Sequence, residues 1–310
     1  MSKFSLEYEQ AQLRAFSAFL LERQQQLANM CDQAKKSGQS TLINPVQFES
    51  FPSEVLASYV QAYKRALRPM LPSGLSVSGL CRVGSKHDGG YVMLPPGEGG
   101  VVYSLGIDDN VDWDLDMARR DFRVWQYDGS ITSLPVNHSS FCFEPLFVHG
   151  TKKGASSAIA DKVATLPQLL KRNGHWGDKR IILKMDIEGS EWDVFKQLDY
   201  EVMQMFSQIL VELHVEITDL IRLPYFTAIL NKIKRTHLPF HVHANNCDRP
   251  VNFCAEKFSY RMEVSYVRRE DYAGFTASRE FYPTPLDAPC LPELPEVELG
   301  YFGLPDRSNG

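Results

Sequence analysis

Residues 180–191, with the sequence RIILKMDIEGSE, decide the fold. The first half of this stretch, 180–185, is an apolar run typical of a buried strand, and the acidic turn that begins at Asp186 leads into a helical pattern at about 191–198. A second strongly apolar run, 208–214, follows that helix. A buried strand, a helix and another buried strand in this order predict one unit of a parallel sheet.

The same alternation extends outward in both directions. Five more strands and three more helices are predicted, the strands at 101–105, 122–127, 141–148, 239–244 and 260–267 and the helices at 111–120, 166–172 and 224–235. Strands that alternate with helices favour a doubly wound sheet. We therefore expect an α/β protein whose seven-stranded sheet is mostly parallel.

Three regions are expected along the chain. Residues 1–75 form an N-terminal helical extension, residues 76–275 hold the sheet, and residues 276–310 form a proline-rich tail that lies over the surface. In the predicted helix 3–36, four leucines are spaced by seven, but charged residues interrupt the second seam of a coiled coil. Packing of this helix on its own domain is favoured, and a homo-oligomer formed through it is the alternative.

Composition and charge exclude several classes of protein. With 33 basic and 38 acidic residues, the 310-residue chain has a net charge of −5, so it has no overall attraction for nucleic acid or an anionic membrane. No apolar segment approaches the roughly 20 residues of a membrane span, and the N-terminus lacks the order of a signal peptide. The six cysteines form no CxxC pair, which favours reduced thiols in a cytoplasmic protein.

Functional residues are expected where the strands end, because ligands of an open parallel sheet bind beyond the carboxyl ends of its strands. The first strand is followed by Gly106, where a ligand can approach the backbone closely. The second is followed by Asp128, which is placed to accept hydrogen bonds from ribose hydroxyls. A plain Asp-Gly turn is the alternative for Asp128.

Several common motifs are absent. No GxGxxG follows the first strand, and the sequence contains no GxxxxGK[ST], HExxH or GxSxG. Dinucleotide dehydrogenases, P-loop NTPases and α/β-hydrolases are therefore disfavoured. An adenosine-containing ligand without a pyrophosphate, such as S-adenosylmethionine, fits better, because it needs a backbone turn and an acid for its ribose but no phosphate loop.

The motifs resemble those of a known family. Residues 184–191, KMDIEGSE, resemble the K-[IM]-D-[IV]-E-G-x-E signature of FkbM-type methyltransferases, and 163–170 and 209–214 resemble the segments on either side of it. Residues 82–91, RVGSKHDGGY, are similar to the R-x-G-x(3)-D-G-G-Y opening of a methyltransferase-like branch. The resemblance covers about residues 80–246. It departs from the family at 104–110, SLGIDDN, which replaces a glycine-rich motif, and at 127–129, YDG, which replaces FEP.

This resemblance implies a class I Rossmann-like methyltransferase that uses S-adenosylmethionine for O-methylation of a hydroxyl group, on a sugar, a glycan or a small molecule. The resemblance and the strand ends together predict which residues bind the cofactor: Asp88, Gly89, Gly90, Tyr91, Ser104, Leu105, Gly106, Asp128 and Ser130. For residues 88–91 a tight turn before a strand is the alternative to a loop over the cofactor.

Catalytic residues are expected on the later strands. Asp186 and His214 end adjacent strands, and either His214 or His243 could take the proton of the acceptor hydroxyl. A second version of the mechanism adds Mg²⁺ bound by Asp186, Glu188 and His214. The alternative function is a catalytically inactive binding module that keeps the methyltransferase fold and acts through its N-terminal helix.

Overall fold

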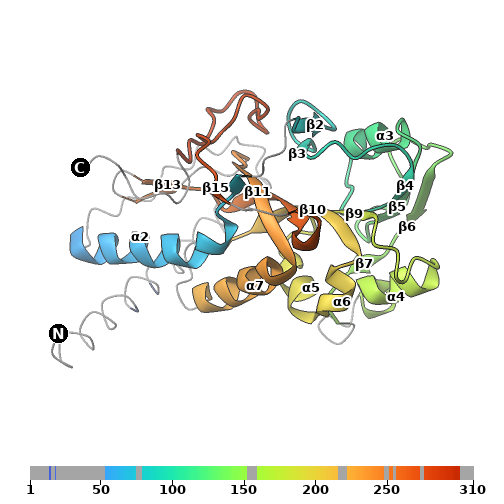
Figure 1. Cartoon of the computed structure of the whole chain (residues 1–310), viewed down its shortest axis with the longest axis horizontal. Coiled ribbons are helices and arrows are strands. Elements are labelled where there is room, and N and C mark those ends of the chain that lie inside the picture. The colour runs from blue at the N-terminus through green and yellow to red at the C-terminus, as the bar shows by residue number, and fades with distance from the viewer. Residues whose placement is uncertain are drawn as a thin grey trace, which may run out of the picture.

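A seven-stranded sheet forms the centre of the molecule (Figure 1). The computed structural model describes residues 53–74, 79–151, 159–215, 222–247, 251–253, 256–272 and 276–300, together with residues 14 and 18. Across the sheet the strands are β11 (His237–Ala244), β14 (Arg261–Arg268), β10 (Phe206–His214), β9 (Ile181–Met185), β4 (Gly100–Leu105), β5 (Phe122–Tyr127) and β6 (Phe141–Glu144).

All neighbouring strands are parallel except β14, which runs antiparallel to both β10 and β11. The predicted α/β class and the mostly parallel seven-stranded sheet are thus confirmed. The sheet is mixed rather than wholly parallel, and it is compatible with a Rossmann-like fold.

Different layers cover the two faces of the sheet (Figure 1). One face is covered by helices α2 (Ser53–Leu67), α4 (Leu166–Arg172), α5 (Glu191–Gln197), α6 (Tyr200–Met203) and α7 (Leu223–Thr236). Over the other face lie the antiparallel pair β2 (Cys81–Val83) and β3 (Tyr91–Met93), helix α3 (Asp112–Ala118) and the C-terminal segment, residues 278–300.

The strands divide their side chains between these layers, because successive residues of a strand point to opposite faces. Tyr103, Leu183 and Val211 belong to the large apolar core on the helical side. On the opposite face, Val102, Ile182 and Leu210 of β4, β9 and β10 are also apolar and pack in one cluster with Trp113 of α3. Towards the carboxyl ends this second face becomes polar, and the candidate site lies there.

Helix α2 belongs to the main core, because its Tyr63 is 1% exposed and is part of the same apolar cluster. The hydroxyl of Thr227 in α7 donates a hydrogen bond to the oxygen of Ala66 at 3.3 Å. The predicted helix 3–36 lies outside the described residues, apart from positions 14 and 18, which are helical.

Two expectations need correction. The predicted strand 141–148 is split into β6 and β7 (Phe147–Val148), because Pro145 has no N–H to donate to a neighbouring strand. The tail is not merely spread over the surface: Tyr282, Cys290 and Val297 are each at most 2% exposed.

The remaining strands form short pairs beside the main sheet. They are β1 (Ser73–Gly74) with β15 (Thr276–Ala277), β7 with β8 (Val163–Ala164), and β12 (Val251–Phe253) with β13 (Glu256–Phe258). Among the described residues, no helix combines the length and the apolar character that crossing a membrane requires.

Candidate functional site

The turns after β4 and β9 meet where the strand order reverses. From β4 the chain builds β5 and β6 on one side and then crosses to β9 and β10 on the other, and ligands of α/β sheets bind at such a switch point. Gly106 has a φ of 80°, and a Cβ there would overlap the backbone oxygen of Asp186. The N–H of Asp186 donates to the oxygen of Leu105 at 2.9 Å. Only glycine allows the two turns to pack this closely.

Asp128 holds the turn after β4 in place. Its Oδ2 accepts the N–H groups of Ile107 and Asp108 at 2.8 and 2.9 Å, and its Oδ1 accepts the N–H and the hydroxyl of Ser130 at 2.7 and 2.5 Å. Burial raises the pKa of Asp128, but these hydrogen bonds outweigh it and the pKa is lowered. A carboxylate has about four acceptor positions, so a ribose hydroxyl must replace one donor, and the Ser130 hydroxyl is the one free to rotate away.

The buried side chain of Lys184, in the neighbouring strand β9, also supports the turn after β4. Lys184 is 6% exposed, and its Nζ donates to the oxygen of Gly106 at 2.6 Å. Ser104 is the register partner of Lys184 and is fully buried, and Leu105 is fully buried in the core on the helical side. Ser104 and Leu105, both predicted as cofactor contacts, therefore support the turn with side chains that do not reach the surface.

Asp186 presents an unpaired oxygen at the end of β9. Its Oδ1 is buried and has no hydrogen-bond partner. Burial raises the pKa of Asp186 to about 6; Lys184 and His214 act to lower it, and Glu191 and Glu188 to raise it. A buried acceptor without a partner calls for one from outside the chain, so a ligand hydroxyl fits this position.

His214 lies beside Asp186, as the strand ends predict. Its Nδ1 is 3.3 Å from Glu191 Oε1, and its Nε2 is 3.2 Å from Glu188 Oε2 and 3.5 Å from Glu212 Oε1. Burial lowers the pKa of His214, but Glu191, Asp186 and Glu188 outweigh it, so the pKa is raised. The protonated ring is favoured, which makes His214 a counter-charge for these acids.

The residues predicted to bind Mg²⁺ do not fit that ion. The side chain of Glu188 is 75% exposed and faces His214 Nε2. Glu191, rather than Glu188, has a carboxylate oxygen within 4.8 Å of donor atoms of both Asp186 and His214. The Oε1 of Glu191 already accepts the backbone N–H groups of Ile187 and Gly189, at 2.8 and 3.2 Å. Mg²⁺ prefers a near-octahedral set of oxygens, so we derive no step through a metal here.

Two acids missed by the sequence analysis complete an acidic rim, which we define as Asp186, Glu212 and Glu263. Glu212 in β10 and Glu263 in β14 are register partners and are 3% and 6% exposed. Burial raises the pKa of Glu212 well above its usual value, and Asp186 and Glu263 raise it further. The available signal in the sequence was that each of these two strands contains a single carboxylate.

His243 cannot take a proton from a substrate, contrary to the prediction. It is 1% exposed, its Nδ1 is 2.9 Å from Glu263 Oε2, and its Nε2 is 3.0 Å from Glu296 Oε1. Burial lowers the pKa of His243, but the two carboxylates outweigh it and raise the pKa to about 10. With both ring nitrogens held, His243 has no free lone pair for catalysis.

The predicted cofactor loop 88–91 forms the turn between β2 and β3. A Cβ on Gly89 would collide with Asn110, and one on Gly90 with the oxygen of Ser85. These two glycines are therefore required by the turn itself. Tyr91 is 3% exposed, whereas the side chain of Asp88 is exposed. Asp88 is the most exposed of the four residues, yet burial of its carboxylate raises its pKa, and Glu263 raises it further.

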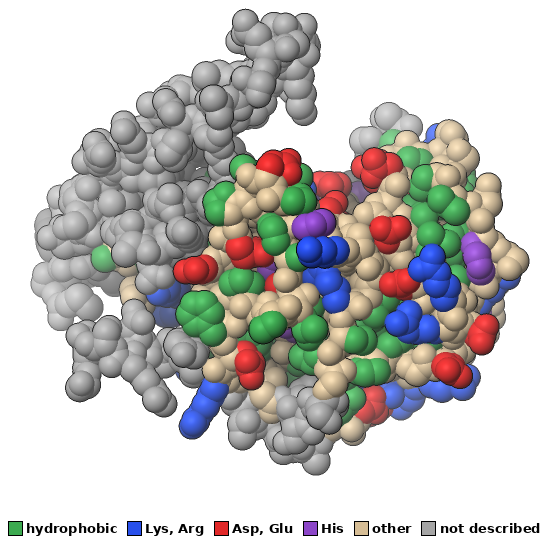
Figure 2. All heavy atoms as spheres, turned by 90° about the horizontal axis from the view of Figure 1, so that it is seen from above, with side chains coloured by type: hydrophobic (Ala, Val, Ile, Leu, Met, Phe, Trp, Pro, Cys, Tyr) green, Lys and Arg blue, Asp and Glu red, His purple; other side chains and the backbone are tan. Residues whose placement is uncertain are grey.

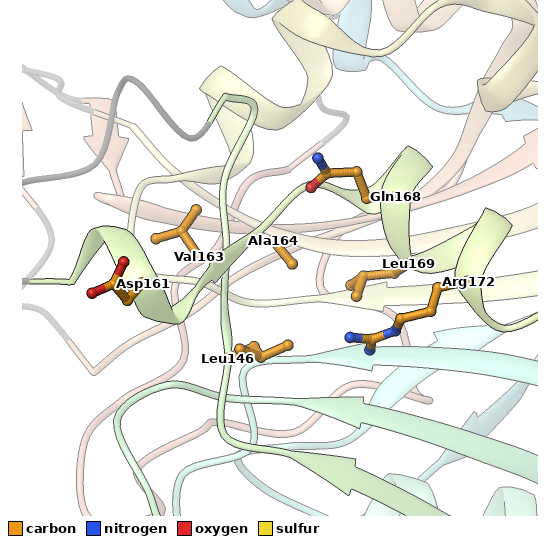
Figure 3. Close-up of a pocket in the computed structure, with 7 residues that line it drawn as sticks. All are labelled: Leu146, Asp161, Val163, Ala164, Gln168, Leu169 and Arg172. Carbon is orange, nitrogen blue, oxygen red and sulfur yellow. The ribbon is translucent and has the colours of Figure 1, made fainter.

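A hollow of about 400 Å³ lies elsewhere, between β8 and α4 (Figure 3). It contains none of the predicted site residues; its lining consists of Leu146, Asp161, Val163, Ala164, Gln168, Leu169 and Arg172. Figure 2 shows the molecule from above, with charged side chains of both signs spread over this view.

Comparisons with known proteins add no family to these observations. No family model matches the chain, and no curated protein is significantly similar to it. The fold and the site therefore define an α/β protein with a buried acidic rim at its switch point.

Proposed function

We propose that this protein is an S-adenosylmethionine-dependent methyltransferase that methylates a hydroxyl group of a sugar, a glycan or a small molecule. The observation that carries the proposal is the acidic rim beside the turn at Gly106. The carboxyl groups of Asp186 and Glu212 favour a cationic ligand, whose charge lowers their raised pKa values and stabilises the ionised forms, and they disfavour a pyrophosphate. S-adenosylmethionine carries a sulfonium and an ammonium group, whereas dinucleotides carry phosphates.

The rest of the site is consistent with this cofactor. The turn at Gly106, which packs against the backbone of Asp186, supplies the backbone turn that the amino-acid end of this cofactor needs. Asp128 receives a ribose hydroxyl when the Ser130 hydroxyl rotates away, because the four acceptor positions of Asp128 are otherwise filled. The mostly parallel sheet and its switch point are compatible with the class I methyltransferase fold that the sequence resemblance implies.

Asp186 is assigned to hold the proton of the acceptor hydroxyl. The Oδ1 of Asp186 is buried without a hydrogen-bond partner. The ring nitrogens of His214 also lack a hydrogen bond of good geometry, but they lie 3.3 and 3.2 Å from carboxylate oxygens of Glu191 and Glu188, which favour the protonated ring. The bound cofactor supplies an electrophilic methyl group. Asp186 aligns the acceptor oxygen with that group, and much of the rate of such a transfer comes from alignment. His214 offsets the negative charge of the surrounding acids.

Transfer of a labelled methyl group tests this proposal. The protein is incubated with methyl-labelled S-adenosylmethionine and a panel of monosaccharides, oligosaccharides and small alcohols, and label in the acceptor is counted. Labelling of a hydroxylated acceptor that is lost in Asp186→Asn supports the proposal. Absence of labelling together with absence of cofactor binding would favour the inactive binding module, whose predicted N-terminal helix lies largely outside the described residues.

A further inference from the structure

Three residues from distant parts of the chain meet beside the acidic rim. Asp88 comes from the turn between β2 and β3, Cys247 follows β11, and Cys290 lies in the C-terminal segment. Their donor atoms, one carboxylate oxygen and two sulfurs, all lie within 4.8 Å of one another. Two thiols and a carboxylate are a ligand set that suits a soft divalent metal such as zinc.

A second group of donors shares the sulfur of Cys290. His243, Glu263 and Cys290 also have donor atoms within 4.8 Å of one another, and Cys290 Sγ is 3.4 Å from Glu263 Oε1. Ligands of a tetrahedral zinc ion are roughly 3.4 to 3.8 Å apart, given Zn–S of about 2.3 Å and Zn–O of about 2.0–2.2 Å. Glu263 Oε1 thus lies at this spacing from Cys290 Sγ, in a group separate from the one that Cys290 forms with Asp88 and Cys247.

The outer partners of this cluster are in place as well. Glu263 Oε2 faces His243 Nδ1 at 2.9 Å, and His243 Nε2 faces Glu296 Oε1 at 3.0 Å. Metal ligands are oriented by such outer hydrogen bonds. Here His243 orients Glu263, the neighbour of Cys290, and Glu296 orients His243. In this series of contacts, His243 has a structural role in place of the predicted catalytic one.

Hydrogen bonds fix the backbone on both sides of Cys290. The oxygen of Pro289 is 2.8 Å from His87 Nδ1. The N–H of Leu291 donates to Asn246 Oδ1 at 2.8 Å, and Asn246 Nδ2 donates to the oxygen of Leu291 at 3.0 Å. Cys290 is therefore held opposite Cys247 by contacts that do not involve sulfur, so the donors are brought together before any ion binds.

The cluster has an excess of negative charge around a buried sulfur. The pKa of Cys290 is raised, first by its hydrogen bond with Cys247, then by burial and by the charges of Glu263 and Asp88. A divalent cation would neutralise these acids and stabilise both thiolates. Asp88 is exposed, so the cluster reaches the surface of the protein at this residue.

We propose that Cys247, Cys290 and Asp88 bind one zinc ion, with Glu263 beside Cys290 and with His243 and Glu296 behind Glu263. The ion joins the C-terminal segment and the β2–β3 turn to the end of β11, and so it closes one side of the candidate site. The cluster borders the acidic rim at Glu263, but zinc binding is measured without cofactor or acceptor, so its test is separate from that of the proposed methyl transfer.

Metal analysis of the full-length protein tests the proposal. The protein is reduced, stripped with a chelator, incubated with zinc chloride and desalted, and zinc is then measured by mass spectrometry. We expect one zinc ion per chain. Replacement by Co²⁺ should give the intense charge-transfer absorption of cobalt–thiolate bonds, a signal that nonspecific surface binding does not produce.

Variants separate this site from the other thiols and acids. Cys247→Ser, which changes a half-buried residue, and Asp88→Asn, which changes an exposed one, should each weaken zinc binding at least tenfold. Cys142→Ser is the matched control, because Cys142 is also half-buried, and it should keep full zinc binding. His214→Ala should likewise keep zinc, because His214 belongs to the other cluster.

Three results would overturn the proposal. One is a reduced, folded protein that binds no zinc. Another is zinc binding that survives unchanged in both Cys247→Ser and Asp88→Asn. The third is a Cys247–Cys290 disulfide in protein purified without reductant, detected by mass spectrometry of its peptides. This result counts against the site when the same protein, once reduced, also binds no zinc.

Discussion

Gly106 and Asp186 are in backbone contact across the switch point of the sheet, so close that a Cβ on Gly106 would overlap the carbonyl oxygen of Asp186. The turn that would receive a ligand and the turn that carries the candidate proton acceptor are thus one packed unit. Asp128 stabilises this unit by accepting the N–H of Ile107, and Lys184 stabilises it by donating to the oxygen of Gly106. A change at Gly106 should therefore disturb ligand binding and stability together.

The first prediction concerns Gly106→Ala. We expect a loss of stability of more than about 2 kcal/mol, because the new methyl group adds a backbone clash to the cost of a left-handed φ, which alone is about 1–2 kcal/mol. S-adenosylmethionine affinity should fall at least tenfold. Denaturant unfolding and calorimetric titration measure the two effects.

Gly174→Ala is the matched control for that variant. Gly174 has a φ of 77°, close to the 80° of Gly106, but a Cβ there would meet nothing within 4 Å. The stability of Gly174→Ala should fall only by the free energy that a left-handed φ costs an alanine, about 1–2 kcal/mol. Its cofactor affinity should not change. Equal losses in the two variants would contradict the packing argument at Gly106.

The second prediction separates Asp128 from Ser130. Asp128→Asn places an amide group against backbone N–H donors, so we expect a loss of about 2 kcal/mol in stability and at least tenfold weaker cofactor binding. Ser130→Ala removes only a donor that a ribose hydroxyl would displace, and it should bind the cofactor at least as tightly as the unchanged protein. Cofactor binding that weakens as much in Ser130→Ala would show that Ser130 itself contacts the ribose.

The third prediction concerns proton transfer. Asp186→Asn should lower kcat about 10²-fold or more once an acceptor is known, and His214→Ala should lower it less, because His214 acts as a counter-charge. Glu201→Gln serves as the control and should keep the unchanged kcat, since Glu201 is an exposed acid in α6, on the helical face of the sheet. Rates at saturating cofactor measure all three variants. A larger loss in His214→Ala than in Asp186→Asn would make His214 the base.

The fourth prediction is a pH dependence of stability at His237. Burial lowers the pKa of His237 to about 4; the Phe206 carbonyl, Asp271 and Glu270 act to raise it, and Arg268 to lower it further. The unfolded chain, with an ordinary histidine pKa of about 6.5, therefore binds this proton more readily than the folded one. Stability should fall as the pH drops from about 6.5 to 4, by about 3 kcal/mol in all.

His237→Gln tests that slope, because glutamine has no proton to take up in this range. The ring nitrogen Nε2 of His237 lies 2.9 Å from the oxygen of Phe206, so the variant should be less stable at neutral pH. Its stability should nevertheless decline less between pH 6.5 and 4. Parallel curves for the two proteins, from denaturant unfolding at several pH values, would count against a buried neutral His237.

Much of the fold follows from the periodicity of the sequence. Apolar runs bounded by turn residues located all seven strands of the main sheet, because buried parallel strands are nearly continuous in their apolar character. The insertion of β14 between β10 and β11 in the opposite direction was not predictable, since a strand's pattern does not record its direction. The short strands β2 and β3 have too few residues for a periodic signal.

The site was predicted less completely. Gly106, Asp128, Asp186 and His214 follow strands that the sequence located, and the sheet brings their ends together. Glu212, Glu263 and Lys184 lie inside strands, so their meeting depends on register, which the sequence does not fix. Cys247 and Cys290 meet only because the C-terminal segment folds back onto β11, a long-range contact without a local signature.

Calorimetric titration of the purified protein tests the central claim most directly. S-adenosylmethionine and S-adenosylhomocysteine are titrated in turn, with NAD as the control ligand. We predict saturable binding of both sulfur ligands in the micromolar range and no binding of NAD, because the acidic rim favours a cation and repels phosphates. Binding of NAD, or of none of the three ligands, would contradict the account.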